Sequence, residues 1–158
     1  MIDVFLAEDI MTTKVETVAE TASIKNITDK MAKKHISSVI VLGDDKKPKG
    51  IISEKDFIKK VLARTQKKNQ KAKDIMSSPI LSISPKESVN NAAKMMRENG
   101  IRHLLVTDEG SMRGIITETD VLNGETEYIK AHQFLQNLIM ALFITILLLF
   151  VIVFRVSP

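Results

Sequence analysis

The chain has no cysteine and no tryptophan, and it has little tyrosine and histidine. Without cysteine it can form neither a disulfide nor a thiolate metal site. The three histidines, His35, His103 and His132, have no metal-ligand motif beside them, which argues against structural zinc. Aromatic residues make up only 4% of the chain, with Tyr128 the only tyrosine, so few rings could stack on bases, which weakens a nucleic-acid function. No nucleophile, general base or metal cluster stands out, so the sequence favours a binding protein over an enzyme.

The chain does contain one short stretch twice. Gly-Ile-Ile-Ser-Glu-Lys-Asp occupies residues 50–56, and Gly-Ile-Ile-Thr-Glu-Thr-Asp occupies residues 114–120. Two β-branched residues followed by a hydroxyl and an aspartate are typical of a buried strand that runs into a capped helix. The flanking residues match as well: Ala7, Asp9, Ile10, Met11, Ser23 and Met31 align with Ala72, Asp74, Ile75, Met76, Ser88 and Met96. The chain is therefore a tandem repeat of about 65 residues, and units this small need to pack together to bury an adequate core.

Each copy predicts the order β-α-β-β-α, which is an α/β (α+β) fold class. Ser23 and Ser88 are suitable N-caps for helices with one apolar face, and Gly100 and His35 stand where these helices would end in left-handed geometry. The expected strands lie at 15–18, 39–42 and 50–53 in the first copy and at 80–83, 104–107 and 114–117 in the second. A helix is expected over 54–62 and a shorter one from Glu118, and an N-terminal helix within residues 1–11 is expected to lie on the first repeat.

This order of elements, with its Asp-Ile-Met opening and its Gly-Ile-Ile-[Ser/Thr]-x-x-Asp ending, resembles the cystathionine-β-synthase (CBS) domain family in its tandem form, the Bateman-type module. The resemblance covers residues 7–122. It implies two CBS repeats, at residues 1–66 and 67–127, that pack as a pair. Residues 128–158 would form a separate C-terminal helix.

The hydroxyls of Ser53 and Thr117 fall where a strand meets a helix, a position that suits a phosphate. Asp56 and Asp120 each offer two acceptor oxygens, which is what two adjacent ribose hydroxyls need. A helix cap followed by an acid that complements the helix dipole explains the same residues, and this alternative stays open. The resemblance implies that the aspartate binds ribose and that the hydroxyl lies at the phosphate of AMP, ADP, ATP or S-adenosylmethionine.

The resemblance also implies two composite clefts, each with residues from both repeats. In one cleft, Thr117 and Asp120 would face Thr12, Val15, Ile36 and Ser37. In the other, Ser53 and Asp56 would face Ser77, Ile80, Ile101, Arg102 and His103. Arg102 and His103 could reach phosphates, whereas Ser37 and Ser38 at the matching positions carry no charge. We therefore expect the Asp56 cleft to prefer the more highly charged nucleotides.

Residues 138–154 contain no charge, and Thr145 is their only polar residue. As a helix these 17 residues would span about 25 Å, close to the ~30 Å core of a bilayer. They predict a single-pass C-terminal membrane anchor, and the excess of Lys and Arg before it places the repeats in the cytoplasm. A buried dimer helix is the alternative interpretation.

Seven basic residues and no acid lie between Lys59 and Lys73. This run suits a solvated helix end and linker, or a contact with anionic lipid headgroups. A contact with nucleic acid fits less well, because few aromatic residues are present to stack on bases.

The sequence thus predicts a non-catalytic, membrane-anchored sensor that binds an adenosyl nucleotide as a regulatory ligand and has no catalytic cofactor. Its expected partners are a second copy in a homodimer, membrane lipid, and an integral membrane protein that it regulates. The alternative is a scaffold that binds protein, nucleic acid or anionic lipid while its nucleotide clefts stay empty.

Overall fold

The computed structural model describes residues 5–62 and 69–156, apart from the side chains of residues 62, 125–129, 131, 148 and 151–156. Two three-stranded sheets form, one in each repeat. The first has the order β1 (Thr17–Ala19), β2 (Ser38–Leu42) and β3 (Pro48–Ser53), and the second has β4 (Ser82–Ile83), β5 (His103–Asp108) and β6 (Ser111–Thr117). In each sheet the first pair of strands is parallel and the second is antiparallel. This arrangement confirms the predicted order of elements.

One amphipathic helix packs on each sheet: α2 (Ile24–Lys34) in the first repeat and α5 (Val89–Asn99) in the second. The predicted N-caps are both present, because the hydroxyl oxygens of Ser23 and Ser88 each accept a backbone N–H at 3.2 Å. The predicted ends are also confirmed. His35 has a φ of 53° and Gly100 a φ of 61°, which is the left-handed conformation that stops a helix.

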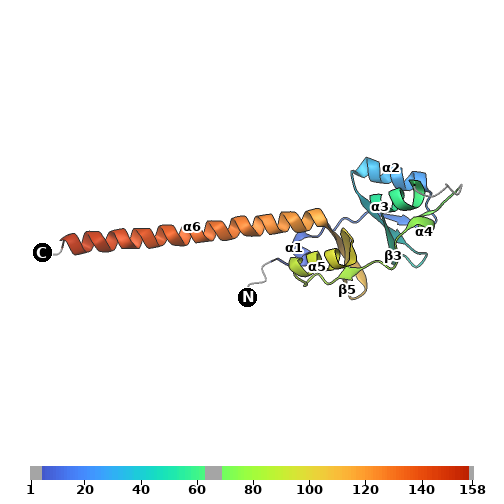
Figure 1. Cartoon of the computed structure of the whole chain (residues 1–158). Coiled ribbons are helices and arrows are strands. Elements are labelled where there is room, and N and C mark those ends of the chain that lie inside the picture. Colours follow the sequence, from blue (N-terminus) through green and yellow to red (C-terminus); the bar gives the residue numbers. More distant parts are fainter. Residues whose placement is uncertain (1–4, 63–68, 157–158) are drawn as a thin grey trace.

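The two short helices exchange repeats. Helix α1 (Ala7–Ile10) precedes the first repeat but packs on the second, and α4 (Ala72–Ile75) precedes the second repeat but packs on the first. The backbone N–H of Ala7 donates to the carbonyl of Glu87 at 2.7 Å, and its side chain is buried in the second core. Figure 1 shows α1 beside α5 and α4 beside α2 and α3. The expectation that the N-terminal helix lies on the first repeat was wrong.

The exchange follows from strand pairing just after each short helix. Thr12 and Ile115 exchange two backbone hydrogen bonds, at 2.9 and 3.0 Å, and Ser77 and Ile51 exchange two at 2.8 and 3.0 Å. Each segment thus extends the edge of the other repeat's sheet. The boundary at residue 66 stays a prediction, and packing crosses it, since Ala7 is buried in the second core and Ala72 and Ile75 are buried in the first.

A third apolar cluster joins the two sheets. Ile40 of the first repeat is buried against Leu105 and Ile115 of the second. Val15 and Ile80, both predicted to line clefts, pack at the edges of this cluster. The two sheets therefore share a core, as the small size of each repeat requires.

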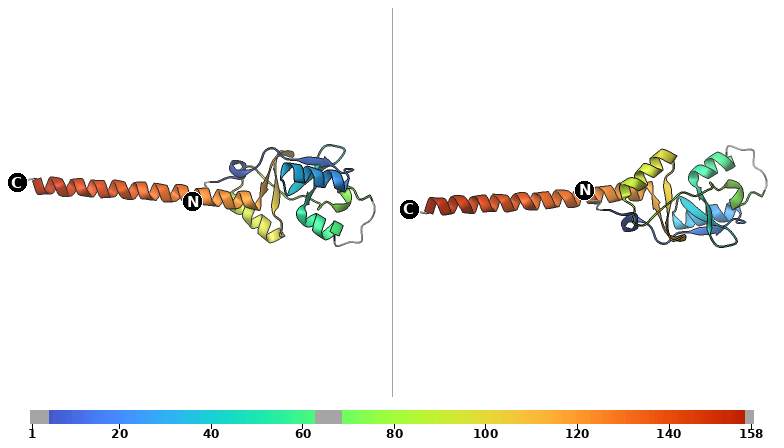
Figure 2. Two further views of the ribbon diagram at one scale, coloured as in Figure 1. Left: turned by 90° about the horizontal axis from the view of Figure 1, so that it is seen from above. Right: turned by 90° about the horizontal axis from the view of Figure 1, so that it is seen from below.

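The helices that follow the two repeated motifs differ greatly in length. The first is α3 (Glu54–Asp56), which continues as the π-helix η1 (Phe57–Leu62). The second is α6 (Glu118–Val156), a single helix of 39 residues that leaves the paired repeats as a rod (Figure 2). The expected shorter helix from Glu118 was wrong, and no break separates it from the C-terminal apolar segment.

The apolar part of α6 is exposed in this chain. Its large side chains from Phe134 to Phe150, among those described, are between 50% and 71% exposed. Among the residues whose side chains the structure describes, no helix combines the length and the apolar character needed to cross a membrane. A bilayer requires about 20 apolar residues, and part of the predicted span 138–154 lies outside the described side chains. The described residues therefore do not show the predicted membrane-spanning helix.

The basic run between Lys59 and Lys73 is described only in part, since residues 63–68 lie outside the described residues. Within the described part, Lys59, Lys71 and Lys73 are exposed. Lys60 is different, because its ammonium group points into the protein and contacts Asp56. The interpretation of the run as a solvated face is thus wrong for Lys60.

Candidate functional site

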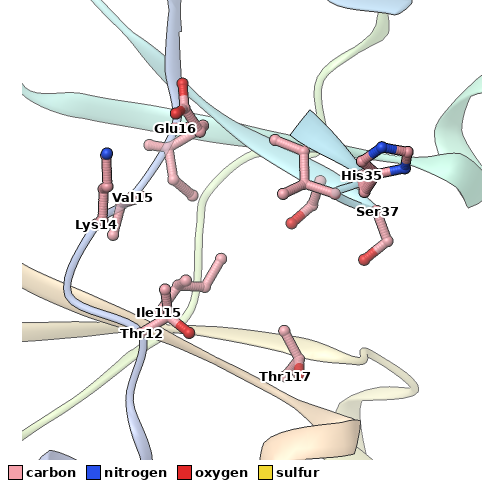
Figure 3. Close-up of a pocket in the computed structure, with 11 residues that line it drawn as sticks. Thr12, Lys14, Val15, Glu16, His35, Ser37, Ile115 and Thr117 are labelled. Atoms are coloured by element: carbon pink, nitrogen blue, oxygen red, sulfur yellow. The ribbon is translucent and has the colours of Figure 1, made fainter. Parts of the chain in front are cut away.

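A cavity of about 210 Å³ opens between the two repeats (Figure 3). Five of the residues predicted for the Asp120 cleft line it: Thr12, Val15, Ile36, Ser37 and Thr117. The other lining residues are Lys14, Glu16, His35, Ser38, Ile40 and Ile115. Thr117 and Ile115 come from β6, and the remaining residues come from the first repeat, so residues of both repeats line the cavity.

The tertiary structure adds charged and apolar groups that the sequence analysis did not assign to this cleft. Lys14 and Glu16 flank Val15 on the segment that leads into β1, and His35 precedes Ile36. In the sequence, only their position next to Val15 and Ile36 could have assigned these three residues to the cleft. Ile40 and Ile115 line the floor because they belong to the apolar cluster between the sheets.

The charge around the cavity is mainly positive. The carboxylate of Glu16 lies 3.1 Å from the ammonium group of Lys30 and 3.3 Å from that of Lys34, both on α2. Hydrogen bonds from Lys30 and Lys34 hold the pKa of Glu16 below its ordinary value, so Glu16 is ionised and its charge is compensated. Lys14 adds an exposed cation at the wall. Lys30 and Lys34 thus compensate Glu16, and Lys14 at the wall can attract an anionic ligand.

Asp120 lies behind Thr117 in this cleft and is not itself a lining residue. Its Oδ2 accepts from the backbone N–H and from the hydroxyl of Thr117, both at 2.8 Å. No donor to its Oδ1 is found among the residues that the structure describes. Half of this carboxylate is therefore used as a helix cap, and the other half remains able to accept hydrogen bonds.

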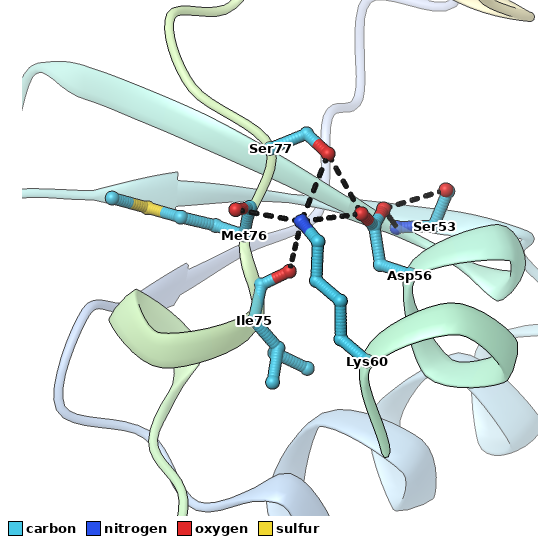
Figure 4. A network of polar contacts seen from close by, with 6 residues as sticks. All are labelled: Ser53, Asp56, Lys60, Ile75, Met76 and Ser77. Carbon is cyan, nitrogen blue, oxygen red and sulfur yellow. Dashed lines mark hydrogen bonds and ion pairs between the residues drawn. The ribbon is translucent and has the colours of Figure 1, made fainter. Parts of the chain in front are cut away.

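Asp56, at the matching position of the first repeat, is surrounded by donors (Figure 4). Its Oδ2 accepts from the backbone N–H of Ser53 at 2.9 Å and from the Ser53 hydroxyl at 2.7 Å. Its Oδ1 accepts from the Ser77 hydroxyl at 2.7 Å and forms an ion pair with Lys60 at 2.9 Å. Burial raises the pKa of Asp56, but hydrogen bonds from Ser77, Lys60 and Ser53 outweigh it and hold this pKa below its ordinary value.

The residues predicted to add charge to the Asp56 cleft have other contacts. Nε of Arg102 pairs with Glu118 at 3.2 Å, and the Arg102 side chain is 78% exposed. Nε2 of His103 lies 3.2 Å from the hydroxyl of Ser37, which lines the cavity of the other cleft. Burial lowers the pKa of His103, and the negative charges of Asp56 and Glu54 offset this only in part. His103 is therefore neutral at pH 7.

Of the remaining predicted residues, Ser77 contacts Asp56, whereas Ile80 and Ile101 pack in apolar clusters. Sequence analysis missed Lys60, whose spacing of four residues from Asp56 was the signal available.

Comparison with known proteins accounts for this duplicated architecture. The sequence pattern of the CBS domain matches residues 7–63 and 72–126. The chain belongs to the CBS domain family. Proteins built from CBS domains are generally non-catalytic regulatory modules, and membership of the family indicates a regulatory role for this tandem pair.

Relatives of this CBS protein include an uncharacterized protein of Methanopyrus kandleri, which is 36% identical over 113 residues, a match that covers 70% of this chain and 58% of the relative. The CBS domain-containing protein YhcV of Bacillus subtilis is 24% identical over 131 residues, which cover 83% of this chain and 93% of YhcV. The chain spans 58%, 30% and 40% of the length of the first three curated relatives it matches.

Solved structures share the CBS pair fold. A CBS domain protein of unknown function from Thermoplasma acidophilum has a TM-score of 0.72 at 26% identity, and the match covers 75% of this chain and 68% of that one. A hexameric CBS-CP12 protein from bloom-forming cyanobacteria has a TM-score of 0.69 at 29% identity, with coverage of 75% and 70%. Some CBS proteins are thus oligomeric.

Proposed function

We propose that this CBS pair is a regulatory sensor that binds an adenosyl nucleotide in the cleft between Thr117 and the first repeat. The observation that carries the proposal is the cavity of about 210 Å³, which five residues predicted for this cleft line from both repeats. A ligand that touches both repeats would stabilise their packing. Nucleotide binding could then alter the affinity of the pair for a partner protein.

The chemistry of the cleft supports a nucleotide with a phosphate. Val15, Ile36 and Ile40 offer an apolar surface for a base. The hydroxyls of Thr12, Ser37 and Thr117 can bind polar atoms, and the surplus of lysine charge attracts an anion. The open Oδ1 of Asp120 suits the adjacent hydroxyls of a ribose.

The size of the cavity sets a limit on what it encloses. Ligand sites are commonly about 300–1,000 Å³, so a volume of about 210 Å³ surrounds only part of a nucleotide. The base and ribose would be held between the repeats, while the phosphates would extend toward solvent near Lys14.

Calorimetric titration of the full chain with AMP, ADP, ATP and S-adenosylmethionine tests the proposal. We expect at least one of these ligands to bind, and we expect Asp120→Ala to weaken binding at least tenfold because it removes the acceptor for ribose. Asp29→Ala is a matched control, since Asp29 is exposed on α2 and pairs with Lys25. Its affinity should equal that of the unmodified protein.

The rival function is a scaffold whose clefts stay empty and whose surface binds protein, nucleic acid or anionic lipid. The absence of heat with all four ligands would favour it and overturn the sensor. The cavity between the repeats, with Lys14 at its wall, favours the sensor, because a docking surface for a macromolecule needs no such cavity.

Homodimer formation and membrane attachment through residues 138–154 stay predictions. What supports attachment is the exposure of the large apolar side chains of α6, because an exposed apolar patch of this extent marks a contact surface. Fractionation of cells that express the full chain tests it. A membrane protein would resist a wash with high salt and high pH, and recovery in the wash would contradict the prediction. Light scattering in detergent would give the oligomeric state.

A further inference from the structure

We infer that the side chain of Lys60 occupies the Asp56 cleft in place of a ligand. Each chain then binds one nucleotide, at Asp120, and not two. This inference rests on the proposed function, because it states which of the two related clefts is open to the ligand. It reverses the expectation that the Asp56 cleft takes the more highly charged nucleotide.

The first step of the argument counts acceptors. A carboxylate has about four lone-pair sites for hydrogen bonds. In Asp56 hydrogen bonds fill three of them, two from Ser53 on Oδ2 and one from Ser77 on Oδ1, and the ammonium group of Lys60 forms an ion pair with Oδ1 beside the fourth. In Asp120 the described residues fill only the two sites on Oδ2. A pair of adjacent ribose hydroxyls needs two acceptor sites, and only Asp120 still has them.

The second step concerns how firmly Lys60 is held. Besides this ion pair, its ammonium group donates three hydrogen bonds, to the carbonyls of Ile75 at 2.8 Å and Met76 at 3.0 Å and to the hydroxyl of Ser77 at 3.1 Å. The side chain is 28% exposed, and that of Asp56 is 8% exposed (Figure 4). A ligand would have to break several charge-assisted bonds in a mostly buried place to reach Asp56.

The third step is the comparison of the two repeats. Gly124 stands four residues after Asp120, where Lys60 follows Asp56, and it has no side chain to reach the carboxylate. Thr12 stands where the second segment has Ser77, and it makes no bond to Asp120 among the described residues. The two groups that contact Oδ1 of Asp56 therefore have no counterpart on Asp120 among the described residues. Lys60 lies in the π-helix η1, a geometry that is frequent at functional sites.

Stoichiometry measured by calorimetry on the full chain tests the inference, with AMP, ADP, ATP and S-adenosylmethionine each used as the probe. We expect one nucleotide per chain in the unmodified protein and two in Lys60→Ala. Lys59→Ala is the matched control, because Lys59 is an exposed neighbour in η1, and it should keep one site. Asp120→Ala should leave no site in the unmodified background and one site in the Lys60→Ala background.

The outcomes separate the two proposals. Two nucleotides per unmodified chain, or a single one in a folded Lys60→Ala protein, would overturn the inference and leave the proposed function standing. No binding by the unmodified protein would overturn the proposed function and the stoichiometry of one. A site gained in Lys60→Ala would then show only that Lys60 occludes the Asp56 cleft. Circular dichroism checks that the variant folds. If it does not, Lys60→Met replaces it, and the unmodified stoichiometry still decides.

Discussion

The hydroxyl of Ser77 lies 2.7 Å from Oδ1 of Asp56, although 21 residues separate the two along the chain. The bond forms because the segment around Ser77 pairs with Ile51 at the edge of the first sheet. The corresponding segment around Thr12 pairs with the second sheet at Ile115, yet Thr12 does not bond to Asp120 among the described residues. The same exchange of segments thus brings a hydrogen-bond donor to Asp56 and none to Asp120.

Ser77→Ala should destabilise the protein by about 1–2 kcal/mol, because it removes a hydrogen bond to a charged and mostly buried carboxylate. Thr12→Ala should change the free energy of unfolding by less than ~0.5 kcal/mol, since its exposed side chain supplies no such bond. Urea denaturation of both variants measures the difference. Equal losses would contradict the asymmetry of the two clefts.

Gly50→Ala and Gly114→Ala should each destabilise the protein by about 1–3 kcal/mol through overpacking. A Cβ at Gly50 would lie 2.7 Å from the carbonyl oxygen of Ser77, and one at Gly114 would lie 2.9 Å from that of Thr12. These backbone atoms belong to the exchanged segments and cannot move without breaking the pairing. Unfolding free energies from urea titration measure the effect.

Gly100→Asn is the control for these glycine variants. Gly100 also has a special conformation, with a φ of 61°, but no atom of the described residues lies within 4 Å of the place that a Cβ would take there. Asn accepts left-handed geometry better than most residues, so this change should cost less than ~1 kcal/mol. If Gly100→Asn lost more stability than Gly50→Ala, the close approach of the neighbouring backbone would not be the reason why glycine begins each motif.

His103→Gln should reduce the loss of stability between pH 7.5 and 5.5. Because burial lowers the pKa of His103 below the value of about 6.5 in the unfolded chain, the unfolded state binds more protons in this range. Stability therefore falls as the pH drops below 6.5, by at most about 1.4 kcal/mol per pH unit from this group. Chemical denaturation at several pH values measures the slope.

The control for the pH experiment is His132→Gln, since His132 is exposed on α6 and far along the chain from the half-buried pair of Ser37 and His103. Its pH profile should match that of the unmodified protein. An unchanged slope in His103→Gln would mean that another group causes the acid sensitivity.

Lys14→Met should weaken ATP binding about threefold to fivefold, a small effect because Lys14 is exposed. It should weaken AMP binding less, because AMP has fewer phosphate charges for Lys14 to attract. The difference should shrink as the salt concentration rises. Lys33→Met, which changes an exposed lysine on α2 outside the cavity, should have no effect. Calorimetry at two salt concentrations measures both variants, and equal effects on AMP and ATP would argue against phosphates near Lys14.

The sequence by itself determined the duplication, the order of elements in each repeat, the caps at Ser23 and Ser88, and the helix ends at His35 and Gly100. These features depend on contacts within a few residues, such as a hydroxyl that accepts a backbone N–H three residues later. It also predicted that Thr12, Val15, Ile36, Ser37 and Thr117 would meet in one cleft, through the family resemblance.

Only the tertiary structure decided which repeat each short helix covers, because the apolar pattern of α1 and α4 would fit either core. The exchange explains why glycine begins each motif: the other repeat's leading segment crosses the backbone there. It also brought Ser77 to Asp56, next to Lys60, whose spacing alone did not show that it would turn inward. Two nearly identical motifs thus have different sites because their distant neighbours differ.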